Sequence, residues 1–373
     1  MIALRWDQVN AWRLKQQHLS ERADRQHMLE VAKALNGLQA QVMSAAELQL
    51  WARVENLTPA DVQDALWRER TLVKTWLWRG TLHLAAASQF PLYIGGLSTL
   101  RHFERPSWQK YFGVSLAELQ AMMEGIRQVL SDSGMKREQL AQALAEYTGI
   151  PQLQEHLMSG WGSLLKPAAF QGLLCFGPSE GQNVTFVQPR HWLGDHLSPV
   201  ESGLALNKIA RHFLNAYGPA RMDEFVRWFG LEAAAAKKIF RALGDEIVEV
   251  DVQGWKAWML RAAVEAMDGL EASSPVRLLP LFDPYTLAVA KHAQYLFPEA
   301  HKGRVYRPQG WISAVVLVGG RIGGVWEYEK QRSKVNVSVE MFAPVDDAVK
   351  QGIAVEVKRL GDFLASEVDL TFV

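Results

Sequence analysis

The feature that most constrains the fold of this chain is an order of elements that recurs three times, in which helices precede two short strands joined by a tight turn. The strand pairs are predicted at residues 70–86, 173–187 and 247–260, where apolar and β-prone residues flank turn residues such as Arg79-Gly80 and Gln253-Gly254. The segments before each pair are predicted to be helical, with glycine-containing bends between the helices. The chain is therefore expected to be built from small repeated modules.

Helices followed by a β-hairpin form the winged variant of the helix-turn-helix, and three of them in tandem are a specific pattern. The last hundred residues differ, because they contain four predicted strands, a hairpin turn at Gly319-Gly320 and a closing helix over 344–361. We predict an α+β fold with three tandem winged helices followed by a β-rich C-terminal module. An unrelated α+β enzyme with incidental hairpins is the alternative. The predicted modules are 1–90, 91–195, 196–270 and 271–373.

Composition excludes several classes of protein. The single cysteine, Cys175, rules out a disulfide framework within the chain and a cysteine-rich zinc site. None of the ten histidines has a cysteine or carboxylate at metal-ligand spacing, so neither a metal nor another cofactor is expected. The N-terminus lacks the pattern of a signal peptide, and the apolar runs are too short to span a membrane. We expect a soluble, cytoplasmic protein with no membrane partner.

The charge of the chain is neutral in total but uneven along the sequence. Residues 66–112 and 301–334 each contain seven lysines and arginines against two acidic residues, whereas residues 243–271 contain seven acidic residues against two basic ones. Such a distribution is compatible with basic walls that bind an anion, including a nucleic acid. Scattered solvated faces are the alternative interpretation.

Two glutamines, Gln39 and Gln41, are separated by a single alanine. In a helix they would point about 200° apart, whereas in an extended segment they point to the same side. Gly37 is predicted to end a helix over residues 21–35, and the sequence 44–47 resembles a capping box that opens the next helix. The glutamines therefore lie in a predicted extended connector. Alternatively, their amides cap helix ends or contact water.

The sequence resembles the AlkZ/YcaQ-type DNA glycosylases over essentially its whole length. The resemblance rests on residues 37–41 (GLQAQ), 71–84 (TLVKTWLWRGTLHL) and 279–285 (LPLFDPY). In this family the catalytic signature is Gln-apolar-Gln in the AlkZ-like branch and Gln-apolar-Asp in the YcaQ-like branch. Gln41 therefore places the chain in the AlkZ-like branch, and the resemblance implies that Gln39 and Gln41 are the catalytic residues.

The implied activity is that of a monofunctional DNA glycosylase for alkylated purines such as N7-alkylguanine, with bulky or cross-linked adducts in its expected range. A guanine alkylated at N7 is cationic, so its glycosidic bond breaks without protonation of the leaving base. The enzyme must then position a water and tolerate an oxocarbenium-like centre. A glutamine carbonyl can accept a hydrogen bond from that water, although it is a weak base and suffices only for an activated leaving group.

The expected partner is double-stranded DNA with alkylated bases, bound by a monomer. Lys74 and Arg79 are predicted to contact phosphates, with His83 nearby, and Arg53 is predicted to orient the glutamines or bind phosphate. Arg79 in solvent at a turn and a structural His83 are the alternatives. For the whole chain, the alternative is a non-catalytic winged-helix DNA-binding protein or transcriptional regulator, which would not depend on the two glutamines.

Overall fold

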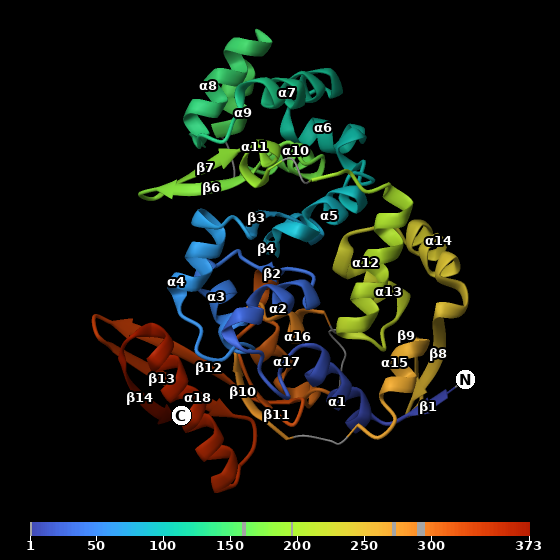
Figure 1. Cartoon of the computed structure of the whole chain (residues 1–373), viewed down its shortest axis with the longest axis vertical. Coiled ribbons are helices and arrows are strands. Elements are labelled where there is room, and N and C mark those ends of the chain that lie inside the picture. Colours follow the sequence, from blue (N-terminus) through green and yellow to red (C-terminus); the bar gives the residue numbers. More distant parts are fainter. Residues whose placement is uncertain (1, 159–161, 195–196, 271–273, 289–294) are drawn as a thin grey trace. The chain divides into compact units, whose positions relative to one another are not determined.

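Figure 1 shows the computed structural model of the chain, which describes residues 2–158, 162–194, 197–270, 274–288 and 295–373. Helices and short sheets alternate along these residues, so the predicted α+β class is confirmed. The chain divides into two compact units, which are described separately. We call Met1–Val62 with Ala210–Val373 the terminal unit, and Gln63–Ile209 the middle unit. No helix among the described residues is long and apolar enough to cross a membrane.

The terminal unit begins with a short strand and helices of modest length. These elements are β1 (Ile2–Leu4), α1 (Trp6–Gln16), α2 (Met28–Ala34), β2 (Leu38–Gln39), α3 (Met43–Trp51) and α4 (Pro59–Gln63). Pro59 is the first residue of α4. The predicted helix over 21–35 is wrong in its first half, because Ala23 instead pairs through its backbone with Arg53 and Glu55. That pairing holds the segment extended until a single 3₁₀ turn precedes α2.

The predicted capping box at Ser44 is also wrong. Helix α3 begins one residue earlier, at Met43, and its N-cap residue Val42 makes no side-chain capping bond. The hydroxyl of Ser44 instead hydrogen-bonds Tyr328 of the C-terminal sheet, and this bond opposes the burial that raises the pKa of Tyr328. The segment outside both helices is therefore residues 38–42, which we call the connector.

The third predicted hairpin is present with the predicted bounds. Strands β8 (Ile247–Val252) and β9 (Trp255–Leu260) are antiparallel and follow α12 (Ser202–Tyr217), α13 (Met222–Phe229) and α14 (Ala233–Leu243). β1 adds to β8 in parallel, and helix α15 (Arg261–Ala266) follows the hairpin. Val250, Met259 and Trp12 are buried in the core that joins this sheet to α1.

The C-terminal part of the terminal unit is a five-stranded sheet in the order β10-β11-β12-β13-β14. The strands are β10 (Val276–Leu279), β11 (Val315–Val318), β12 (Arg321–Gln331), β13 (Lys334–Met341) and β14 (Glu367–Phe372). The first four are antiparallel, whereas β14 was not predicted and pairs with β13 in parallel after the long helix α18 (Asp347–Leu364). Figure 1 shows α18 beside this sheet, and short helices α16 (Pro284–Leu287) and α17 (Lys302–Val305) precede β11.

The predicted turn at Gly319-Gly320 joins β11 to β12. Val318 pairs with Arg321, so the loop has two residues, and both glycines have positive φ values of 55° and 79°. Two consecutive positive φ values define the type I′ turn, whose twist matches that of the flanking strands. Gly319 and Gly320 therefore form a hairpin turn between two strands, as predicted.

The middle unit contains the first two predicted hairpins. Strands β3 (Leu72–Trp76) and β4 (Leu82–Ala86) are antiparallel, and so are β6 (Cys175–Glu180) and β7 (Asn183–Val187), to which β5 (Met135–Lys136) adds. Trp76 of β3 packs on Phe176 of β6, with ring centroids 4.7 Å apart. The two hairpins therefore share an aromatic core.

Helices make up most of the remainder of the middle unit. They are α5 (Phe90–Leu97), α6 (Pro106–Phe112), α7 (Leu116–Val129), α8 (Arg137–Thr148), α9 (Gln152–Met158), α10 (Lys166–Phe170) and α11 (Pro189–Leu193). The sequence of residues 153–169 favours a helix; the structure has α9 and α10 there, and residues 159–161 between them lie outside the described part of the chain.

His83 lies on β4, inside the first hairpin, and is only 3% exposed. Its Nδ1 is 2.9 Å from the carbonyl oxygen of Thr81, which favours the tautomer with the proton on Nδ1. Burial, and secondly the positive charge of Arg79, lower the pKa of His83 to about 3. The imidazole is therefore neutral in the folded protein at physiological pH.

We predict that Gly320→Ala destabilises the protein more than Gly319→Ala. Both substitutions put a side chain at positive φ, which costs about 1–2 kcal/mol. At Gly320 the new Cβ would also approach the Cβ of Asn10 to 2.7 Å, whereas at Gly319 its nearest neighbour would be the Ser274 hydroxyl at 3.3 Å. The free energy of unfolding in urea should fall by about 3 kcal/mol for Gly320→Ala. Equal losses for the two variants would contradict the close approach.

The buried His83 should make the protein sensitive to acid. Because the unfolded chain binds a proton near pH 6.5 and the folded chain only near pH 3, the free energy of unfolding should decrease as the pH falls through this window. The slope from this residue is at most about 1.4 kcal/mol per pH unit. Urea titrations from pH 7 to 4 should show a shallower decrease for His83→Asn. The exposed His191, replaced in the same way, should keep the wild-type slope.

Candidate active site

The connector leaves α2 through a left-handed helix ending. Asn36 and Gly37 have φ values of 56° and 92°, and the Gly37 N–H donates to the carbonyl of Ala32 at 3.3 Å. Glycine adopts this conformation readily, which is why it ends helices so often. The chain then enters β2 with extended geometry, so the predicted helix stop at Gly37 is confirmed.

The two glutamines of the connector differ in exposure. Gln39 ends β2 and is 7% exposed, whereas Gln41 is exposed in the irregular segment that leads to α3. Leu38 and Ala40 are buried. Both glutamines lie outside the helices, as predicted, and only Gln41 presents a largely accessible amide at the surface.

A buried side chain of α3 hydrogen-bonds to the main chain of the connector. The Gln49 amide Nε2 donates to the main-chain carbonyl of Gln39 at 3.0 Å, and Gln49 is completely buried. Arg53, just after α3, in turn donates to the carbonyl of Gln49 at 2.9 Å. The position of the first glutamine of the signature therefore depends on residues that the sequence analysis did not select, Gln49 above all.

The predicted DNA contact of Arg53 stays a prediction, and in this structure the side chain is paired elsewhere. The guanidinium is completely buried and forms two parallel hydrogen bonds with the carboxylate of Asp283, at 2.7 and 2.8 Å. Such a pair satisfies a guanidinium in the geometry that it would otherwise offer to a phosphate. The alternative prediction, that Arg53 orients the glutamines, is compatible with its contacts.

The other predicted DNA contacts lie on the β3–β4 hairpin of the middle unit. Arg79 occupies the turn with a φ of 56° and is half-buried. The Lys74 ammonium lies 5.5 Å from the ring centroid of Phe176, so its stem packs against the hairpin core. His83 is buried and neutral, which disfavours a charged contact with phosphate. Its place inside the hairpin fits the structural alternative, and its role in DNA binding stays a prediction.

Another positive charge of the middle unit lies at this turn. Lys166 of α10 lies against Gly80, since a Cβ added there would approach its Cδ to 3.3 Å. Burial lowers the pKa of Lys166. Burial also lowers the pKa of His102, and the positive charges of Arg105 and Lys166 add to this effect. Arg105 falls in the predicted basic segment. Lys166 was missed, because no spacing in the sequence relates α10 to the turn.

Two pockets of the terminal unit adjoin the connector or the sheet beside it. The first, of about 110 Å³, is lined by Val42 and Ser44 on the helix side and by Trp326 and Tyr328 on the sheet side. The second, of about 270 Å³, shares the wall at Trp326 and includes the basic side chains of Arg304 and Arg307. The second pocket therefore places part of the basic stretch 301–334 beside β12.

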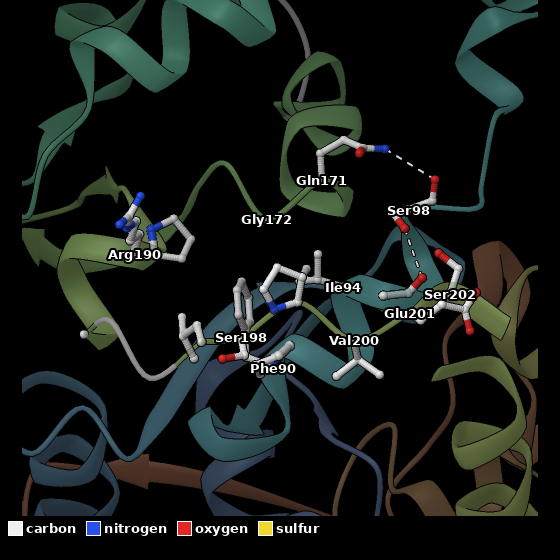
Figure 2. Close-up of a pocket in the computed structure, with 16 residues that line it drawn as sticks. Phe90, Ile94, Ser98, Gln171, Gly172, Arg190, Ser198, Val200, Glu201 and Ser202 are labelled. Carbon is white, nitrogen blue, oxygen red and sulfur yellow. Dashed lines mark hydrogen bonds between the residues drawn. The ribbon is translucent and has the colours of Figure 1, made fainter. Parts of the chain in front are cut away.

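A larger pocket of about 990 Å³ lies in the middle unit, among α5, α10 and α11 (Figure 2). Gln171 donates to the carbonyl of Ser98 across one side of it, and Arg190 and Glu201 supply charges. None of the predicted site residues lines it. Within the described residues, no group of three or more histidine, cysteine or acidic side chains is arranged to hold a metal.

Comparison with known proteins agrees with this geometry. The family model described as DNA glycosylase AlkZ-like matches residues 32–363, a range that includes the connector, the first hairpin and Asp283. A curated protein of Streptomyces sahachiroi, the interstrand DNA cross-link repair glycosylase, is 35% identical over 333 residues, which cover 87% of this chain and 88% of the relative.

A solved structure leads to the same family. The Streptomyces sahachiroi DNA glycosylase AlkZ superimposes with a TM-score of 0.92 at 31% sequence identity, and the match covers the whole of both chains. The architecture and the sequence thus agree over nearly the full length. The chain belongs to the AlkZ-like DNA glycosylase family.

Proposed function

We propose that this protein is a monofunctional DNA glycosylase that hydrolyses the N-glycosidic bond of alkylated purines in double-stranded DNA. N7-alkylguanine is the simplest substrate of this class, and the proposal includes bulky and cross-linked adducts because the curated relative is named for cross-link repair. The observation that supports it most is the Gln39-Ala40-Gln41 connector, which is held outside the helices in a chain of this family. The proposed reaction needs no cofactor.

The proposed mechanism assigns positioning roles to two neutral amides. The exposed Gln41 amide is placed to meet an incoming water or the deoxyribose, whereas Gln39 is fixed by its buried surroundings. An amide carbonyl can orient a water but removes a proton poorly. The alkylated base supplies the missing driving force, because its positive charge is neutralised when the base leaves with the electron pair of the glycosidic bond. Neutral damaged bases such as uracil should therefore be poor substrates.

We further propose that the cations around the first hairpin turn contact the DNA backbone. Arg79 and Lys74 remain from the sequence-based prediction, and Lys166 and Arg105 join them because of their place in the middle unit. Exchange of condensed counterions for these side chains would provide affinity without sequence preference. Such binding suits an enzyme that must search undamaged DNA for rare lesions.

The proposed architecture is three tandem winged helices and a β-rich module, with boundaries at 1–90, 91–195, 196–270 and 271–373. Each of the three predicted hairpins is present and follows helices of the same module. Helices α12–α14 with β8 and β9 form the simplest example. We propose that the protein acts as a monomer in the cytoplasm.

The decisive experiment is release of base from a duplex that contains one N7-methylguanine, under single-turnover conditions. We expect the wild type to release the base and the Gln39→Ala, Gln41→Ala double variant to lose at least 100-fold in rate, because the water is no longer positioned. The double variant should still bind the duplex with the wild-type Kd, since neither amide belongs to the cationic surface.

The same assay separates the alternatives. A duplex with uracil in place of N7-methylguanine should be cleaved at a rate lower by orders of magnitude, and equal release of the two bases would contradict the mechanism. A wild type that binds DNA but releases neither N7-methylguanine nor a cross-linked adduct would favour the non-catalytic DNA-binding protein. Full activity in the double variant would exclude the two glutamines as catalytic residues.

The cationic surface is tested by the salt dependence of binding. Each phosphate contact contributes about 0.9 to the slope of log K against log salt concentration, so Arg79→Gln and Lys74→Gln should each lower the slope by about that amount. Arg127 is a suitable control, because it is exposed on α7 and paired with Glu124 at 2.8 Å. Arg127→Gln should leave the slope unchanged, and an unchanged slope in all three variants would refute the surface.

A further inference from the structure

We propose that Asp283, Arg53 and Gln49 form a positioning relay that sets the orientation of the connector through the main chain of Gln39. This inference rests on the proposed function, in which the connector holds the catalytic amides. The three residues are completely buried and none of them is placed to touch substrate. They are therefore positioning residues, and the relay links the segment after β10 to the catalytic segment after α2.

The relay starts at a carboxylate whose direction is fixed. Asp283 is the N-cap residue of α16, and its Oδ1 accepts from the main-chain N–H of Tyr285 at 2.9 Å. The same oxygen accepts from Nη2 of Arg53, and Oδ2 accepts from Nη1. A carboxylate that is held by both a helix N-terminus and a guanidinium has no freedom to rotate.

Arg53 transmits this constraint to α3. Its Nη1 bonds both Asp283 Oδ2, at 2.8 Å, and the carbonyl of Gln49, at 2.9 Å. Gln49 is four residues before Arg53, so its carbonyl lies in the last turn of α3. Carbonyls in the last turn of a helix have no N–H donor from a following turn. The guanidinium therefore fixes the end of α3 relative to Asp283.

Gln49 completes the relay. Its Nε2 donates to the carbonyl of Gln39 at 3.0 Å, while its buried Oε1 has no hydrogen-bond partner among the described residues. An unsatisfied buried oxygen costs free energy that an apolar side chain of the same shape would avoid. Packing alone therefore does not explain a glutamine at this position, whereas its hydrogen bond to the connector does.

The bond to Gln39 controls more than one residue. Because the peptide group is planar, fixing the Gln39 carbonyl also fixes the N–H and Cα of Ala40, and so restricts the path to Gln41. A weak base acts only through its position, and a misplacement of about 1 Å can reduce the rate about 100-fold. The catalytic amides of this proposed site therefore depend on the relay more strongly than an ionisable base would.

The chain also contains matched buried groups that touch neither the connector nor the relay. Thr185 of β7 is 1% exposed, and its hydroxyl donates to the main-chain carbonyl of Pro178 at 2.7 Å. Glu356 is 2% exposed and forms a second buried pair with Arg22, at 2.6 Å. These residues provide controls for the loss of a buried hydrogen bond to a main-chain carbonyl and for the loss of a buried carboxylate.

The experiment compares Gln49→Met with Thr185→Val, and Asp283→Asn with Glu356→Gln. Methionine matches the length of glutamine but donates no hydrogen bond. We expect Gln49→Met and Asp283→Asn to lower the single-turnover release of N7-methylguanine about 10- to 100-fold, with the Kd for the duplex unchanged. The two controls should stay within about threefold of wild type. In a Gln41→Ala background the loss from Gln49→Met should shrink, because the group that it positions is gone.

A second measurement does not depend on activity. Hydrogen exchange of the segment 36–43 should become faster in Gln49→Met and Asp283→Asn but not in the controls. If Asp283→Asn fails to fold, the Gln49→Met and Thr185→Val pair still decides the question. A wild-type rate together with wild-type exchange in Gln49→Met would overturn the relay. If the wild type releases no base, the proposed function fails, and the exchange data alone uphold or overturn the control of the connector.

Discussion

The buried ion pair between Arg53 and Asp283 joins parts of the chain that are far apart in sequence. One partner follows the helix behind the connector, and the other opens the short helix after β10, so the N-terminal helices and the C-terminal sheet meet at this point of the terminal unit. A buried pair contributes little net stability, because desolvation offsets most of the attraction. Its effect is geometric: it permits one relative placement of the two segments and strongly disfavours others.

That geometric role agrees with the chemistry of the proposed site. A carboxylate base would tolerate some displacement, because its charge acts over several ångströms, whereas a neutral amide acts only through a directed hydrogen bond. In the proposed mechanism the amides are weak catalysts and the cationic alkylated base is a good leaving group. The reactivity of the substrate itself therefore determines which bases are released. An uncharged catalyst also avoids placing a negative charge beside phosphates. The cost is that the connector must be held rigidly, which explains the buried amide and guanidinium behind it.

Features determined by local chemistry could be predicted from the sequence, and features determined by distant partners could not. The type I′ turn at Gly319-Gly320 and the hairpin of β8 and β9 depend on neighbouring residues, and both were placed correctly. In contrast, β1 is a strand because it adds in parallel to β8, far along the chain, and β14 is a strand because it adds in parallel to β13 across the helix α18. The proposed capping role of Ser44 failed because Tyr328, far along the chain, binds its hydroxyl. Arg53 and His83 looked like DNA contacts for a similar reason, since a sequence shows charge but not burial.

The burial of Arg53 and His83 bears on how affinity and catalysis are divided in the proposed function. The connector has buried positive charge behind it that is already neutralised by Asp283, so the terminal unit adds little attraction for phosphate at that point. The basic side chains near the turn of the first hairpin belong to the middle unit instead. In the proposed function the groups that hold the DNA are separate from those that orient the water, so salt should weaken binding without altering the rate of the bound complex. Such a separation lets one weak catalytic device act on adducts of different size, provided that each leaves as an activated base.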